Sequence, residues 1–104
     1  MNLTQAKVLT IIAESVFETK LVDLIERAGA SGYSIEEVGR GRGSHGSRAG
    51  TIESERMIKF FVVVPQNVAD SILRELTRSF LPQHGVKVLL QNADVMNWTM
   101  MPVS

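Results

Sequence analysis

The chain has 104 residues, 44% of them hydrophobic, and its 11 basic and 11 acidic residues leave a formal net charge of zero. This length predicts a single domain spanning residues 1–104, and the balanced charge argues against non-specific nucleic-acid binding, which needs excess positive charge. The absence of cysteine excludes disulfides, thiolate metal sites and cysteine nucleophiles, and two histidines alone make no convincing metal site.

The first half of the domain predicts a strand, a helix and a second strand. The apolar, β-branched run 7–13 is typical of a buried strand. Ser15 and Glu18 have the spacing of a capping box, and apolar residues then recur at helical intervals as far as Ala28. Gly29 is expected to end this helix in the left-handed conformation. Residues 33–38 (YSIEEV) then predict the second strand.

The second half predicts a strand, a helix and a last strand. Residues 57–64 (MIKFFVVV) form a run too apolar for a solvated face, so we expect a central strand that Pro65 ends. Asn67 is the expected N-cap of a helix that stops before Pro82. Residues 86–90 predict the fourth strand, and 97–104 a C-terminal tail.

The predicted order of elements is βαββαβ, which favours an α+β, ferredoxin-like sandwich with both helices on one face of an antiparallel sheet. The other face of that sheet needs cover. Because the run 57–64 is so apolar, we expect a partner subunit to supply it, and a trimer closes such sheets well.

A long glycine- and arginine-rich segment separates the second and third predicted strands. Between Val38 and Ile52 there are five glycines, three arginines, one histidine, two serines and no acidic residue. Glycines let backbone N–H groups approach an anion, and arginine pairs with phosphate oxygens. This composition favours a phosphate-binding loop, although a solvated surface hairpin has the same composition. An RGG-like RNA contact is a weaker alternative, because no aromatic residue lies between the arginines.

Two known nucleotide-binding motifs match parts of this segment, but the neighbouring residues and predicted elements exclude both. Gly41-x-Gly43-x-x-Gly46 matches the dinucleotide fingerprint, but that motif must lead from a strand into a helix, and a strand follows here. The same stretch begins like a P-loop, but it lacks the lysine–serine/threonine pair. Neither a Rossmann nor a P-loop site is therefore predicted.

The chain resembles the PII signalling superfamily over about residues 6 to 96. The strand 7–13, the segment GASGYS from Gly29, and above all the loop GRGSHGSR from Gly41 to Arg48 resemble its PII-like branch, which includes SbtB and carboxysome-associated PII proteins. The resemblance implies a homotrimer with a flexible T-loop over 39–56. It also implies adenine nucleotides bound between subunits, with bicarbonate as a second ligand in carboxysome-associated members. It implies a cytoplasmic protein without membrane insertion, which fits a sequence with no secretory signal or apolar span.

By resemblance, the nucleotide-binding residues would be Gly39, Gly41, Arg42, Gly43, Ser44, Arg48, Phe80, Gly85 and Val86. The chain departs from the family pattern in several places. His45 stands where many relatives have arginine, and the second glycine- and lysine-rich phosphate loop of standard PII proteins is reduced to residues 81–85. The uridylylated tyrosine and the C-terminal cysteine pair of some SbtB proteins are also absent. These differences argue against a nitrogen-signalling PII protein.

The resulting expectation is a non-catalytic sensor with no cofactor, which binds an adenine nucleotide of the AMP, ADP, ATP or cAMP class and regulates inorganic-carbon uptake. Its partner would be a bicarbonate transporter or another carbon-uptake protein. The alternatives are a slow nucleotide hydrolase on the same site, although no nucleophile–base set or carboxylate pair is visible, and a structural ferredoxin-like oligomer without ligand.

Overall fold

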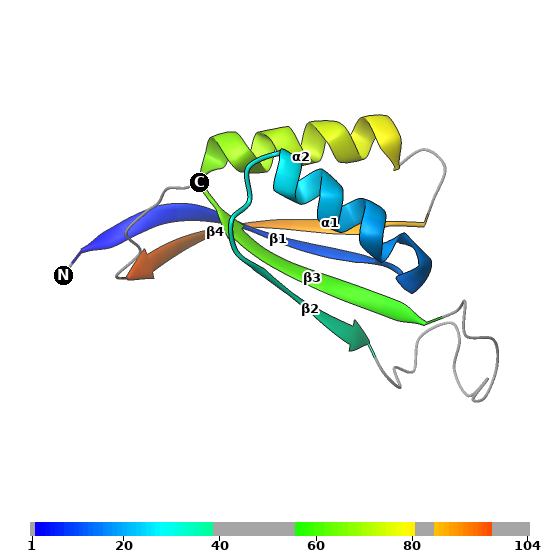
Figure 1. The fold of residues 1–104 in the computed structure, drawn as a ribbon. Coiled ribbons are helices and arrows are strands. Elements are labelled where there is room, and N and C mark those ends of the chain that lie inside the picture. Colours follow the sequence, from blue (N-terminus) through cyan, green and yellow to red (C-terminus); the bar gives the residue numbers. More distant parts are fainter. Residues whose placement is uncertain (1, 39–55, 81–84, 97–104) are drawn as a thin grey trace.

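The computed structural model describes residues 2–38, 56–80 and 85–96 (Figure 1). One antiparallel sheet has the strand order β2-β3-β1-β4. Its elements, in chain order, are β1 (Leu3–Glu14), a 3-10 turn η1 (Ser15–Phe17), α1 (Glu18–Arg27), β2 (Tyr33–Val38), β3 (Met57–Val64), α2 (Gln66–Ser79) and β4 (Lys87–Met96). The predicted α+β, ferredoxin-like order is confirmed, whereas residues 39–55 of the expected T-loop and the tail 97–104 lie outside the described residues.

Both helices cover the same face of the sheet (Figure 1). Each helix buries one apolar stripe, with Leu21, Leu24 and Ile25 in α1 and Ala69, Ile72 and Leu76 in α2. These residues recur three or four positions apart, as one face of a helix requires. The charged residues between them remain on the outside, so the two helices form a layer with one apolar and one solvated side.

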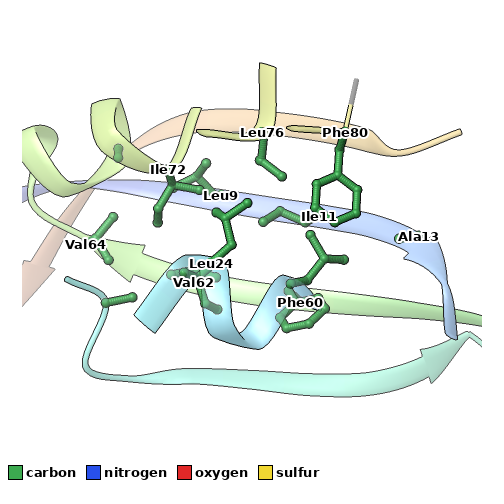
Figure 2. Close-up of a cluster of buried hydrophobic side chains, with 14 of the residues drawn as sticks. Leu9, Ile11, Ala13, Leu24, Phe60, Val62, Val64, Ile72, Leu76 and Phe80 are labelled. Carbon is green, nitrogen blue, oxygen red and sulfur yellow. The ribbon is translucent and has the colours of Figure 1, made fainter. Parts of the chain in front are cut away.

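The core lies between this helix layer and the two central strands (Figure 2). Leu9 and Ile11 of β1 and Phe60 and Val62 of β3 are fully buried there. Both strands alternate buried with less buried positions, because successive side chains point to opposite faces of a sheet. The prediction that residues 57–64 form a central strand is therefore confirmed.

Both predicted helix starts are wrong. Glu14 still pairs with Met57, and the Ser15 N–H donates to the Arg56 carbonyl at 2.8 Å, so the strand ladder holds the backbone where the capping box was expected. A 3-10 turn without a side-chain cap follows instead. The second helix begins one residue after β3, with Pro65 at the N-cap, so Asn67 already lies inside the helix.

The strands β1 and β4 are longer than predicted. They pair continuously from Leu3 opposite Met96 to Ile12 opposite Lys87. Apolar patterning misses the outer part of this ladder because polar residues such as Asn92 and Asp94 occupy it. Backbone hydrogen bonds between the two strands extend the ladder beyond the apolar core.

The first helix ends at Arg27, and the predicted left-handed glycine, Gly29, follows two residues later. Gly29 has a φ of 112°, and a Cβ on it would lie 3.4 Å from a methyl carbon of Val68 in α2. Glycine therefore allows both the left-handed turn and the close approach of the two helices at this point.

The sheet face opposite the helices, called here the open face, has no cover within the described part of the chain. The register places Val8, Thr10 and Ile12 of β1 on it, beside Phe61 of β3 and Leu89 of β4. Phe61 is 46% exposed and Leu89 51% exposed. An apolar surface at the centre of a sheet is a typical site of protein association.

Replacement of Ile11 should test the central role of the β1–β3 pair. Ile11→Ala removes a fully buried side chain, and we expect the free energy of unfolding to fall by about 2–5 kcal/mol through lost transfer energy and a residual cavity. Val16→Ala is the control, because Val16 is 68% exposed. Urea denaturation at matched protein concentration measures both variants, and equal losses in the two would contradict the assignment of the core.

Candidate functional site

Four segment ends meet at one end of the sheet, called here the loop end. Val38 and Glu14 both pair with Met57, which brings the end of β2, the end of β1 and the start of β3 together. Ile12 pairs with Lys87, so β4 begins at the same end. The arginine-rich segment therefore leaves and re-enters the sheet at the end where residues 80–86 connect α2 to β4 (Figure 1).

The loop base is the end of β2 together with the start of β3, which flank the arginine-rich segment. Two ion pairs join these strands. Arg56 lies 3.8 Å from the carboxylate of Glu37, and Lys59 lies 4.0 Å from that of Glu36. All four side chains are exposed, so the ion pairs contribute little to stability. Their main effect is on local charge, because each cation faces one carboxylate and the base is left nearly neutral.

Phe80 is buried, with 4% of its surface exposed. Its ring makes an edge-to-face contact with Phe17, with centroids 5.7 Å apart, and the Lys20 ammonium lies 6.0 Å from its centroid. Since the ring belongs to the core, it is not available for stacking on a ligand within this chain. Its contribution to a site would be to hold the start of the segment that follows it.

Gly85 and Val86 lead into β4 at the loop end. Gly85 is exposed, and a Cβ placed on it would meet no atom within 4 Å. Val86 is half-buried and packs against the core. Nothing in the described packing of the chain therefore requires glycine at position 85.

Of the predicted nucleotide-binding residues, Gly39, Gly41, Arg42, Gly43, Ser44 and Arg48 lie outside the described residues. The strands that flank them form one edge of the sheet, whereas Gly85 and Val86 adjoin β4 at the opposite edge. The two groups share the loop end, but β1 lies between the strands β2 and β3 that flank the first group and the strand β4 that follows the second.

Lys20 is a residue of this region that sequence patterning did not single out. On the sequence it is one of several charged residues on the solvated side of the first helix. In the structure its ammonium lies beside Phe80, immediately before the 81–85 segment. No local sequence pattern could have shown this contact, because only the packing of the folded chain brings residue 20 to residue 80.

Tyr33 has a packing role. Its ring lies 6.3 Å from that of Phe60, and its hydroxyl donates to the Glu26 carboxylate at 2.7 Å. This hydrogen bond raises the pKa of Tyr33 above its ordinary value of 10.0, with smaller effects from desolvation and the negative charge of Glu26. The contact joins the end of α1 to the start of β2.

Acidic residues and histidines do not gather into a metal-binding group within residues 2–38, 56–80 and 85–96. Over the same residues, neither helix is long and apolar enough to cross a membrane.

The fold and the arrangement at the loop end define a ferredoxin-like domain with a long arginine-rich insertion between its second and third strands. The model of the family described as Nitrogen regulatory protein P-II matches residues 6–97. The chain therefore belongs to the PII family. The predicted membership is confirmed.

Solved structures place the chain among PII-like members of this family. A PII-like signalling protein from Thermus thermophilus is 36% identical with a TM-score of 0.77, and the alignment covers 91% of this chain and 93% of that one. CPII from Thiomonas intermedia, in a complex with ADP, AMP and bicarbonate, is 31% identical with a TM-score of 0.71, and the alignment covers 92% and 100%. A search of curated proteins returned no match.

A more distant structure, the ATP complex of GlnK from Bacillus subtilis, is 16% identical with a TM-score of 0.60. The alignment covers 86% of this chain and 84% of GlnK. This likeness extends the fold, but not the site, to GlnK.

The Tyr33–Glu26 hydrogen bond predicts a dependence of stability on pH. The raised pKa means that the folded protein holds the phenolic proton more tightly than the unfolded chain does. The stabilisation is therefore fully present below about pH 10 and is lost as the pH rises through the folded-state pKa. Tyr33→Phe should reduce the free energy of unfolding by about 1 kcal/mol near neutrality.

Urea denaturation of the wild type and of Tyr33→Phe at about pH 8 and about pH 11 measures this effect, since the phenol of the unfolded chain titrates between these values. The difference between the two proteins should shrink at the higher pH. A difference that grows with pH would contradict the assigned direction.

Proposed function

We propose that this protein is a non-catalytic PII-like sensor that binds an adenine nucleotide between subunits at the loop end. The observation that carries the proposal is the membership of the PII family, together with the 31% identity to CPII in a structure that holds ADP, AMP and bicarbonate. Gly41, Gly43, Ser44 and Arg48 would hold the phosphates from one subunit, with Gly39 and Arg42 assisting. Gly85 and Val86 would border the adenine from the neighbouring subunit, and the buried Phe80 would hold the start of the segment that leads to them.

The separation of these two groups within one chain supports a site shared between subunits. The loop base lies at the β2–β3 edge and residue 85 at the β4 edge, with β1 between them. Gly85 leaves open space that the described part of its own chain does not use. A neighbouring subunit that brings its β4 edge to this loop base would complete the site.

A homotrimer built through the open face meets this requirement. Phe61 and Leu89 are about half exposed in the single chain, beside the half-buried Val8 and Ile12. Burial of apolar surface stabilises association by roughly 25 cal/mol per Å² before the entropic cost of association. Each copy would thus cover the apolar face that the helices leave open.

The same ligands suggest a role in carbon metabolism. Bicarbonate accompanies ADP in a CPII structure that is 30% identical to this chain with a TM-score of 0.74. We propose bicarbonate as a second ligand here. The ligands would set the conformation of the T-loop at 39–56, which would regulate a bicarbonate transporter or another carbon-uptake protein in the cytoplasm. The carboxysome-associated or SbtB-like branch is the proposed subfamily.

Hydrolysis on this site is the less favoured alternative. The described part of the loop end presents three carboxylates, Glu14, Glu36 and Glu37, and the last two each already face a cation. A general base needs a carboxylate or histidine within reach of an attacking water. We therefore expect binding without turnover, and steady phosphate release from ATP would favour the hydrolase instead.

Arg48→Ala tests the phosphate contact. Hydrogen bonds to charged groups contribute about 1.5–3 kcal/mol, so the affinity for ADP should fall about 10- to 100-fold. Isothermal titration of the wild type and the variant with ADP measures this loss. Arg74→Ala, on the outer side of α2, is the matched control and should bind like the wild type. No heat with millimolar-range ADP in the wild type would reject the proposed site.

Phe61→Glu tests the assembly. A carboxylate at the centre of the open face would have to be buried without a partner, which costs several kcal/mol per ion. We expect the trimer to dissociate into monomers, measured by sedimentation equilibrium. Val16→Glu is the control, because Val16 is also exposed but lies on the turn after β1. An unchanged mass for Phe61→Glu would contradict the assembly.

A further inference from the structure

The outer side of the helix layer carries a groove between α1 and α2. It has a volume of about 490 Å³ and is lined by Leu24, Arg27, Ala28, Ser71, Arg74, Glu75 and Arg78. Residues 24, 27 and 28 come from the last turn of α1 and its C-cap, and residues 71, 74, 75 and 78 lie on one side of α2, so each helix contributes one continuous wall. The groove faces solvent, because its three arginines are exposed.

The lining is strongly cationic for a protein without net charge. Three arginines and one glutamate leave it with a charge of +2, whereas the whole chain carries zero. The floor is different in character: Leu24 is buried and Ala28 half-buried. The small side chains of Ala28 and Ser71 leave the space between the arginines unfilled.

Intramolecular ion pairs leave much of this positive charge available. Arg27 lies 2.9 Å from Asp23 and Arg78 lies 3.2 Å from Glu75, yet the two arginine side chains are 76% and 65% exposed. Exposed pairs of this kind are worth about 0–1 kcal/mol, so a competing carboxylate can replace them. Arg74 makes no hydrogen bond or ion pair that involves any of the described residues.

We propose that this groove is a docking surface for an extended acidic segment of a partner protein. Arg74 and Arg78 are one helical turn apart, about 6 Å along the axis. Carboxylates on alternate residues of an extended chain are about 6.6–6.8 Å apart, so two of them reach both arginines at once. Arg27 faces the same segment from the opposite wall, and guanidinium groups pair well with carboxylates.

The shape of the groove favours a peptide over a small anion. The groove is open to solvent along the two helices, and its arginines are largely exposed. Small-ligand pockets instead bury most of the ligand surface. An extended segment gains from several weak contacts in a row, with its apolar side chains on Leu24 and Ala28.

This surface is separate from the proposed nucleotide site. Its lining comes from the outer sides of the two helices, whereas the nucleotide site uses the T-loop and the β4 edge. A partner therefore binds the helix layer independently of the ligand that is bound at the T-loop. Peptide binding to the groove does not require nucleotide.

The test is fluorescence anisotropy with a labelled octaglutamate peptide on the full-length protein at low salt. Arg74→Glu should weaken binding at least about 10-fold, because it removes one attraction and adds one repulsion. Lys7→Glu changes the net charge equally outside the groove and should bind the peptide like the wild type. Arg48→Ala should also bind the peptide normally, which separates this surface from the nucleotide site.

Further measurements complete the test. Raising the salt from about 50 mM to about 500 mM should weaken peptide binding, because exposed charges are screened. Urea denaturation should show Arg74→Glu to be as stable as the wild type. Absence of peptide binding to the wild type, or equal losses in Arg74→Glu and Lys7→Glu, would overturn the proposal. So would binding to phosphatidylglycerol vesicles in place of the peptide.

Discussion

The antiparallel pairing of β1 with β3 is the constraint on which the rest of this structure depends. Leu9, Ile11 and Ala13 face Val62, Phe60 and Ile58 across this ladder, and all six side chains are buried against the helices. A shift of one residue in either strand would turn these side chains to the open face. The register therefore decides at once where the helices pack, where the loop begins and which side chains remain for a second subunit.

Much of the fold could be predicted from the sequence because its signals are local. The period of the apolar residues identified both helices, and Gly29 marked the end of the first. The errors lie where tertiary contacts overrule local preference. Ser15 has the chemistry of an N-cap, but its N–H bonds to Arg56 across the sheet, and β4 continues through polar residues that β1 holds in place.

The candidate site was less predictable, and for a different reason. The composition of the 39–50 segment favours a phosphate-binding loop. No local pattern shows that this segment starts from β2 at one edge of the sheet, whereas residue 85 leads into β4 at the other edge. Phe80, expected beside the adenine, is instead buried, because its ring packs on Phe17 of the turn before α1. The inter-helix groove was missed because its two walls, 24–28 and 71–78, are about fifty residues apart in the sequence.

The pairing of Val38 with Met57 has a consequence for how this protein can change over evolutionary time. Because the ladder fixes both ends of the segment between them, the sheet does not depend on the segment's length. Each doubling of a flexible loop costs only about 0.6 kcal/mol of closure entropy. Insertions and substitutions there leave the core intact, so a lineage could exchange the recognition properties of this segment while it keeps the scaffold unchanged.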